Sequence, residues 1–300
     1  MSTSINSDCK LLLYADDSTI MFSHKNPEFI SQKLGQELES CSEWLVDNKL
    51  SLHLGKTECI LFGPKRKLKN VTEFQINCNG HIINSQNSVK YLGIDIDQNL
   101  SGEKTANSII KKVNSRLRFM YRKANCLSAE TRKTLSMALI QCHFDYSCSS
   151  WYAGITRALK NKLQVAQNKT VRFIKSMGPR TSIKQAELSS LGFLNIENRV
   201  KQLRLNHAHK IYYDTCPSYL KNNFIKINEH HAHNTRSSQI NYVTPKIKGI
   251  ESTTFYYNGI HDWNSLPDSI KSINDLQRFK KEVKCHLIHT SEERERRVIS

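Results

Sequence analysis

Apolar residues change their spacing near residue 101, and this change restricts the chain to a mixed α+β fold. Before that point, short apolar runs alternate with turn-forming residues, beginning with KLLLYADDSTIMF at 10–22. After that point, apolar residues recur every three or four positions. The first helix predicted there carries the apolar stripe Ile109, Val113, Leu117 and Met120. Short runs between turn residues indicate strands, and a period near 3.6 residues indicates helices. We therefore expect antiparallel strands with one helix over 1–100, followed by a mainly α-helical region.

Two short buried strands are predicted at residues 10–15 and 18–23, with Asp16 and Asp17 at the turn between them. Asp tolerates the backbone conformations that a tight hairpin requires. A helix then begins at Pro27, a residue type that suits the first helical position, with Asn26 as its expected N-cap. Further strands are predicted over 50–54, 57–62 and 90–96.

The rest of the chain is predicted to be helical. Residues 101–180 form a basic helical segment, and residues 181–300 form a mixed region. Ser128 is of a type that caps helices and is expected to begin the second helix of the basic segment. A last helix is expected over 275–289, followed by a solvated, disordered tail from about residue 290.

The net charge of +17 is unevenly distributed. Residues 1–100 contain 10 Lys and Arg against 12 Asp and Glu, whereas residues 101–300 contain 34 against 15, a net charge of +19. A basic region of this size indicates a polyanionic partner, most often nucleic acid. The alternative is a solubilising surface.

Composition places the chain among intracellular globular proteins. No apolar run approaches the roughly 18 residues that a membrane span requires, so no membrane partner is expected. The start MSTSINSDCK lacks the basic and apolar segments of a secretory signal. The nine cysteines are scattered and odd in number, which favours reduced thiols.

The adjacent carboxylates Asp16 and Asp17 stand in otherwise apolar surroundings. Two like charges about 4 Å apart repel by roughly 4 kcal/mol at an effective dielectric constant near 20. Either one carboxylate holds a proton or a cation lies between them. Mg²⁺ prefers hard oxygen ligands and completes its coordination with water and phosphate. The alternative is an ordinary solvated turn.

The residues around this pair resemble a known enzyme family. LLLYADDSTIMF is similar to the third palm motif of reverse transcriptases, in the YADD form of non-LTR (LINE-type, jockey-like) retrotransposons. WLVDNKLSLHLGKTECILFG at 44–63 resembles the next palm motif, and VKYLGIDID at 89–97 resembles the segment that grips the primer end. CHFDYSCSSWY, LQVAQNKTVRFI and HDWNSLPDSI resemble stretches beyond the palm. The resemblance covers roughly residues 8–288 in the expected order.

The resemblance implies an RNA-directed DNA polymerase that copies RNA into DNA by two-metal nucleotidyl transfer. Residues 1–100 would be the C-terminal half of the palm, 101–180 a helical thumb and 181–300 a C-terminal tail. The implied partners are an RNA template, a DNA primer or target and dNTPs, and the implied location is the nucleus or cytoplasm as a ribonucleoprotein.

The resemblance also implies roles for individual residues. Asp16 and Asp17 would be catalytic ligands of two Mg²⁺ ions, and Lys56 would lie near the leaving pyrophosphate. Tyr14 would contact the nucleotide or template. The primer terminus would be positioned by Tyr91, Leu92 and Gly93.

The sequence departs from the family in one respect. The reaction needs a third carboxylate, a Gln-Gly segment and the fingers, which the family places upstream of YADD. The pair Phe144-Asp145 lies downstream in a helical pattern and is no substitute. We therefore expect the chain alone to be inactive. The alternative function is a non-catalytic nucleic-acid-binding remnant.

Three further groups of residues are candidates. A basic helix face would contact the nucleic-acid backbone through Lys111, Lys112, Arg116, Arg118, Arg122 and Lys123. The alternative is an amphipathic helix with Phe119 and Met120 in the core and solvated charges. Asp95 and Asp97 are either metal ligands or a polar strand end. Two histidine tracts resemble metal ligands but lack a Cys-x-x-Cys partner: His207 with His209, and His230, His231 and His233.

Overall fold

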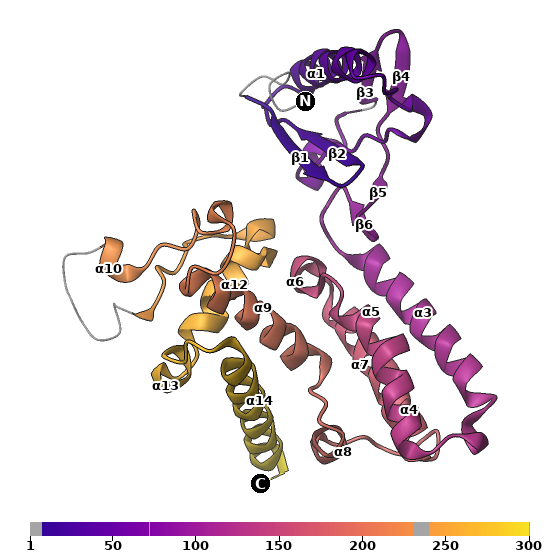
Figure 1. The fold of residues 1–300 in the computed structure, drawn as a ribbon, viewed down its shortest axis with the longest axis vertical. Coiled ribbons are helices and arrows are strands. Elements are labelled where there is room, and N and C mark those ends of the chain that lie inside the picture. Colours follow the sequence, from indigo (N-terminus) through magenta and orange to yellow (C-terminus); the bar gives the residue numbers. More distant parts are fainter. Residues whose placement is uncertain (1–7, 72, 231–239, 300) are drawn as a thin grey trace. The chain divides into compact units, whose positions relative to one another are not determined.

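The computed structural model of the chain describes residues 8–71, 73–230 and 240–299 (Figure 1). They fall into two compact units, Met1–Ser101 and Gly102–Ser300, which divide where the apolar spacing changes. The first unit carries small antiparallel strand pairs and the second is mainly helical, so the fold is α+β.

The strands of the first unit pair as three separate antiparallel hairpins within the described residues. They are β1 (Lys10–Tyr14) with β2 (Asp17–Met21), β3 (Gln75–Cys78) with β4 (His81–Asn84), and β5 (Ser88–Tyr91) with β6 (Ile94–Asp97). A two-residue loop joins each pair, and the first loop residue has a positive φ: 51° at Ala15, 50° at Asn79 and 45° at Leu92. Such loops match the right-handed twist of the strands that they connect.

The predicted strand at 90–96 is wrong, because this segment is a hairpin. The chain reverses at Leu92 and Gly93, and Gly93 readily adopts the φ of 82° found there. A second hairpin, which the sequence analysis did not predict, turns at Asn79 and Gly80. Asn-Gly is a preferred pair for a loop with positive φ at both positions.

The predicted strands at 50–54 and 57–62 are also absent. The first runs without ladder partners in the described part of the chain and ends in a 3₁₀ turn over Leu54–Lys56. In the second, only Cys59 makes a β-bridge, to Ser85. An alternating pattern forms a strand only where a neighbouring strand takes up its backbone hydrogen bonds.

Helix α1 (Pro27–Asp47) packs against the β3–β4 hairpin. Its start is confirmed as predicted, since the Asn26 side chain accepts a hydrogen bond from the backbone of the first turn at 2.9 Å. At Gly35, a Cβ would lie 2.6 Å from the carbonyl oxygen of Asn77, so glycine permits this close approach. The shared core is formed by Leu34, Leu38, Cys59, Ile76 and Ile83.

The second unit consists of helices joined by short turns. Its N-terminal part contains α3 (Glu103–Tyr121), α4 (Ala129–Ser136), a π-helical turn (Met137–Gln141), α5 (Cys142–Asp145), α6 (Cys148–Trp151) and α7 (Arg157–Lys175). Its C-terminal part contains α8 (Gln185–Ser190), α9 (Ile196–Tyr212), α10 (Ile227–His230), α12 (Phe255–Asn264), α13 (Asp268–Lys271) and α14 (Leu276–Ile299). Residues 102–300 form one unit, with no division near 180.

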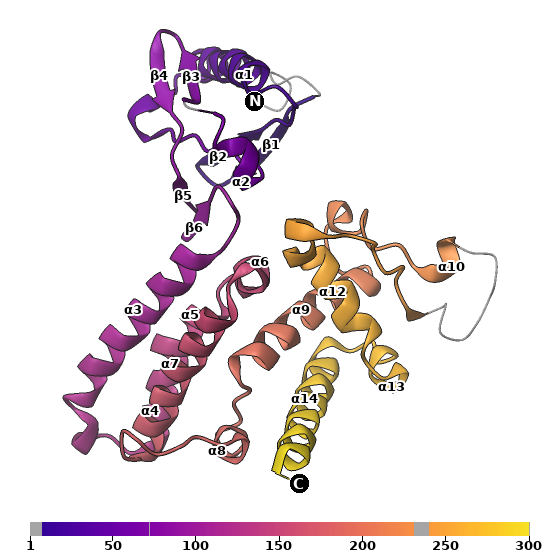
Figure 2. The same ribbon diagram turned by 180° about the vertical axis from the view of Figure 1, so that it is seen from behind.

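Helices α3 and α7 lie side by side (Figure 1 and, from behind, Figure 2). The four residues of the predicted apolar stripe on α3 are all buried, which confirms that helix face. The predicted cap of the next helix is confirmed too, because the Ser128 hydroxyl accepts a hydrogen bond from the Thr131 backbone at 3.1 Å.

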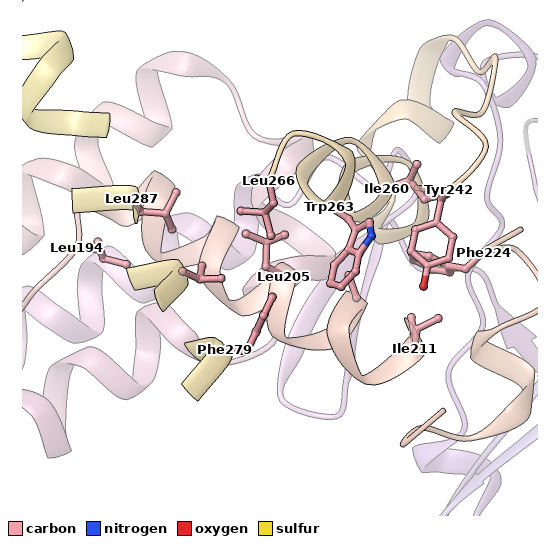
Figure 3. Close-up of a cluster of buried hydrophobic side chains, with 12 residues drawn as sticks. Leu194, Leu205, Ile211, Phe224, Tyr242, Ile260, Trp263, Leu266, Phe279 and Leu287 are labelled. Carbon is pink, nitrogen blue, oxygen red and sulfur yellow. The ribbon is translucent and has the colours of Figure 1, made fainter. Parts of the chain in front are cut away.

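A hydrophobic core joins α9, α12 and α14 (Figure 3). Trp263 is fully buried at its centre, and its indole N–H donates to the carbonyl oxygen of Ile240 at 2.9 Å. The Tyr212 ring stacks on the indole with centroids 5.0 Å apart, and Phe279 lies 6.0 Å away. This core holds the C-terminal helices as a fixed group.

The predicted disordered tail is wrong, because α14 continues to Ile299. Two carboxylates of its last turns accept hydrogen bonds from α8. Glu292 accepts from the Ser189 hydroxyl at 3.3 Å, and Glu295 accepts from the Gln185 backbone at 3.2 Å. These contacts give the charged end of the chain a surface on which to remain helical.

Candidate functional site

The YADD stretch forms the tip of the β1–β2 hairpin (Figure 1). Tyr14 ends β1 and pairs with Asp17, the first residue of β2. The loop therefore consists of Ala15 and Asp16, one residue earlier than predicted. Pairing of Tyr14 with Asp17 leaves a two-residue loop, the commonest hairpin connection.

The predicted burial of this hairpin is wrong. Cross-strand pairs share a face, and one face carries Leu12, Tyr14 and Met21, whose exposed fractions are 38%, 64% and 40%. Helix α1 packs against β2, but the described residues place no layer over the face that carries Leu12, Tyr14 and Met21. Burial depends on such a neighbouring layer, which an apolar run does not provide by itself.

The side chains of Asp16 and Asp17 are exposed, and neither side chain has a hydrogen-bond or ion-pair partner in the part of the chain that the structure describes. In water, two unit charges about 4 Å apart repel by only about 1 kcal/mol. Water therefore screens most of the repulsion between them. Both carboxylates are available to bind a ligand.

Ala15 holds the loop in a strained conformation. Its φ of 51° lies in the left-handed region, which residues with a Cβ rarely occupy. This conformation costs roughly 1–2 kcal/mol for a residue other than glycine. Strained residues of this kind cluster at functional sites.

The other residues with predicted polymerase roles lie on other parts of the first unit. Lys56 ends the 3₁₀ turn and is exposed. Tyr91 ends β5, and Leu92 with Gly93 forms the β5–β6 loop. Among the described residues, no hydrogen bond or ion pair joins Lys56 to either carboxylate of the YADD hairpin.

Asp97 has a structural role at the end of β6. Its Oδ1 accepts hydrogen bonds from the backbone N–H groups of Asn99 at 3.0 Å and Ser101 at 3.1 Å, and its Oδ2 accepts from the Ser101 hydroxyl at 2.9 Å. Asp95 lies opposite Lys90 in the hairpin. This arrangement favours the polar strand end over metal ligation.

The third carboxylate of a polymerase site is not found among the described residues. Within them, no group of three His, Cys, Asp or Glu side chains is placed to hold a metal ion. Asp145 of the Phe-Asp pair accepts two hydrogen bonds from Arg199, at 3.0 and 2.7 Å. Asp16 and Asp17 supply the hard oxygens that Mg²⁺ prefers, and as a donor pair they suit part of a magnesium site.

The predicted nucleic-acid-binding residues lie on α3 and the turn that follows it. All six are exposed, and none forms an ion pair in the described part of the chain: Lys111, Lys112, Arg116, Arg118, Arg122 and Lys123. Met120 is buried as the amphipathic interpretation predicted, but Phe119 is 67% exposed, so its placement in the core is wrong.

The charge of this region is almost entirely of one sign. Residues 104–186 contain 17 Lys and Arg but only two acidic residues, Glu130 and Asp145. Asp145 is already paired with Arg199. A surface that serves solubility usually mixes both signs, whereas uncompensated positive charge attracts polyanions.

The buried histidine His209 belongs to the core. Its Nε2 lies 2.8 Å from the Ile273 carbonyl oxygen, and its ring packs on Phe279 with centroids 4.2 Å apart. Burial lowers the pKa of His209. The tract of His230, His231 and His233 lies outside the side chains that the structure describes.

One surface feature was missed by the sequence analysis. An open groove of about 580 Å³ lies beside the β3–β4 hairpin, and amide side chains line it: Gln75, Asn84, Asn87 and Gln98. The Asn79-Gly80 pair was the available signal, since it predicts the hairpin that forms one wall.

Comparison with known proteins leaves this site without a counterpart: no family model matches the chain, and neither a curated protein nor a solved structure does. Among the helices described, none is long and apolar enough to cross a membrane.

Proposed function

We propose that the chain is part of an RNA-directed DNA polymerase of the non-LTR retrotransposon type. The observation that supports this proposal is the β1–β2 hairpin, which presents at its tip the side chains of Asp16 and Asp17, both without a partner among the described residues. The first unit would contribute half of the palm, and the helices over 102–180 would act as the thumb. The partners would be an RNA template, a DNA primer and dNTPs, in a ribonucleoprotein of the nucleus or cytoplasm.

The residues of the first unit would divide the work of nucleotidyl transfer. Asp16 and Asp17 would hold Mg²⁺ together with a carboxylate from outside the described residues. When bound, the ions supply activation of the primer hydroxyl and neutralisation of the leaving phosphates. Lys56 would stabilise or protonate the leaving pyrophosphate. Tyr14 would contact the nucleotide, and the β5–β6 loop would position the primer end.

The exposed face of the hairpin supports the same proposal. Leu12, Tyr14 and Met21 form an apolar surface that the described residues of the first unit leave partly exposed. Exposed apolar surface of this kind marks a contact with another segment or chain. In the proposed polymerase, the remaining palm would cover it.

The first test is an extension assay on the purified chain with poly-rA, oligo-dT, dTTP and Mg²⁺. We expect no template-dependent extension, because no group of three His, Cys, Asp or Glu side chains among the described residues is placed to hold the metal ions. Extension above background that disappears in Asp16→Asn would contradict this expectation.

The second test restores the missing parts. The fingers and upstream palm of a related element, fused before Met1, should give extension activity. Asp16→Asn should then lower the rate at least about a thousandfold, roughly 4 kcal/mol of activation free energy. Lys56→Ala should lower it by about 10²–10⁴-fold. Asp47→Asn is the matched control, because Asp47 is an exposed carboxylate at the end of α1. A fusion in which Asp16→Asn keeps a near-normal rate would show that the hairpin is only a turn.

A non-catalytic nucleic-acid-binding function is the second candidate. The uncompensated charge of residues 104–186 favours it, and it requires no metal site. Binding should weaken with salt, with a slope of log K on log salt near −0.9 for each phosphate contact on duplex DNA. A flat salt dependence would refute both candidates, whereas binding without activity in the fusion would leave this one.

A further inference from the structure

An exposed aromatic ring lies within the basic surface of α3. Phe119 is 67% exposed, and Arg116 and Lys112 precede it by three and seven residues. Residues at these spacings occupy one face of a helix. With a rise of about 1.5 Å per residue, Arg116 lies ~4.5 Å along the axis from Phe119 and Lys112 ~10 Å. The face therefore places two cations in line below one ring.

The charges of both cations act on α5, which packs against α3. Burial lowers the pKa of His143 on α5, and the charges of Arg116 and Lys112 lower it further. On the opposite side, Asn114 accepts a hydrogen bond from Lys169 of α7 at 3.0 Å. The ring and its cations thus lie away from the α3–α7 contact.

Beyond Glu103 in the first turn, α3 carries no acidic side chain that could compete for these cations. From Lys104 to Ser128 the sequence contains no Asp or Glu. In the described part of the chain, neither Lys112 nor Arg116 forms an ion pair. The positive charge of this face suits a polyanion. The exposed ring of Phe119 is an additional feature, which binding of a phosphate backbone alone does not require.

We propose that this face of α3 binds single-stranded nucleic acid, with an unpaired base stacked on the Phe119 ring and neighbouring phosphates bound by Arg116 and Lys112. The inference rests on the proposed nucleic-acid binding and specifies that the bound nucleic acid is single-stranded. Sites for single strands combine cationic tracks with rings on which bases stack. In a duplex, the base faces are covered by their neighbours, so the ring would have no partner there.

The test measures fluorescence anisotropy of the full chain with a labelled oligo(U) of about 20 nucleotides and with a duplex of the same length, a span that covers at least one site of ~4–16 nucleotides. Phe119→Ala should weaken binding of the single strand by about 5- to 30-fold, within the range that base–aromatic stacking contributes. Binding of the duplex should stay within about twofold, and Phe119→Trp should restore single-strand affinity.

Matched variants separate the ring from the charges. Tyr219→Ala removes an aromatic ring that is 68% exposed elsewhere in the same unit, and it should leave both affinities unchanged. The double variant K112Q/R116Q should lower the single-strand salt slope by about 0.7 per lost contact. The control variant K246Q/K248Q removes the same amount of charge from two other exposed lysines and should lower the single-strand salt slope less. Circular dichroism should show an unchanged helix content for Phe119→Ala.

Each outcome distinguishes the inference from the proposed function. If the wild-type chain binds neither oligonucleotide, nucleic-acid binding itself is refuted. If it binds both and Phe119→Ala changes neither, or weakens both equally, the stacking site is refuted while nucleic-acid binding stands. If poly-glutamate competes as well as oligo(U), with the same dependence on Phe119, an acidic protein is the better partner and the inference is overturned.

Discussion

Breaking the Asp145–Arg199 pair is expected to destabilise the helical unit by about 2–3 kcal/mol, because hydrogen bonds to charged groups contribute about 1.5–3 kcal/mol. Asp145 accepts both of its hydrogen bonds from one guanidinium, at 3.0 and 2.7 Å, and this geometry joins α5 to α9. Asp145 also accepts from Gln141 at 2.8 Å, and Arg199 donates to Gln202 at 2.7 Å. Loss of the carboxylate would leave Gln141 Nε2 and the Nε and Nη2 of Arg199 without their partner.

The exposure of the pair sets the size of the effect. The Arg199 side chain is 30% exposed and that of Asp145 is 23% exposed. Exposed pairs contribute about 0–1 kcal/mol, whereas breaking a buried pair costs about 3–5 kcal/mol. The bidentate geometry and partial burial place this pair between the two, with an expected coupling energy of about 2 kcal/mol. For a unit of this size, such a loss lowers the melting temperature by about 4–8 °C.

A double-mutant cycle with Asp145→Ala, Arg199→Ala and the double variant measures the coupling by urea denaturation near neutral pH. Asp145→Asn is the isosteric control, because it keeps the shape and removes the charge. Arg199→Lys should recover only part of the stability, since an ammonium cannot form both bonds in the same fork. A coupling energy below about 0.5 kcal/mol would show that water screens the pair as it does at a surface, and would refute the reasoning.

Further predictions concern backbone strain and pH. Gly102→Ala should destabilise the protein more than Gly80→Ala, which costs about 1–2 kcal/mol of strain alone. Both residues have positive φ, but only at Gly102 would a Cβ meet another group, the carbonyl oxygen of Trp151 at 2.5 Å. Urea denaturation of the two variants compares their free energies of unfolding. Ala15→Gly should raise stability by up to about 1 kcal/mol, because glycine adopts the loop conformation without strain. A lower melting temperature for this variant would contradict the assignment of strain. Burial lowers the pKa of His209, so the unfolded chain binds a proton there before the folded one does. Stability should fall as pH drops below the unfolded value of about 6.5, and His209→Gln should weaken this dependence; an unchanged pH profile would refute it.

Local patterns were enough to predict the helices that bury one face. The stripe on α3 follows from spacing alone, and the starts of α1 and α4 follow from Asn26 and Ser128, because capping depends on residues within one turn. The Asn79-Gly80 loop was equally local and could have been predicted. The β5–β6 loop begins with Leu92, a residue type that rarely adopts positive φ. The pairing of β5 with β6 therefore determines the conformation of this loop, and the loop residues do not predict it.

Other features depend on contacts between segments far apart in the sequence. Burial of the YADD strands depends on a layer that the described residues do not supply. The helical end of α14 depends on α8, about a hundred residues earlier. The role of Asp145 depends on Arg199, which is 54 residues away. The tip of the candidate site could thus be predicted, but not its exposure.

The distribution of charge makes the two proposed activities separable by mutation. The candidate chemistry lies in a unit whose first hundred residues carry a net charge of −2, and the candidate binding surface lies in residues that carry +19. In the fused polymerase, Asp16→Asn should lower the rate of extension and leave the affinity for nucleic acid unchanged or slightly higher, because it removes a negative charge. K112Q/R116Q should lower affinity and its salt dependence, and saturating primer–template should then recover the rate. If both variants change rate and affinity together, the hairpin and the basic helix do not act as separate sites, and the division of labour proposed for the two units is wrong.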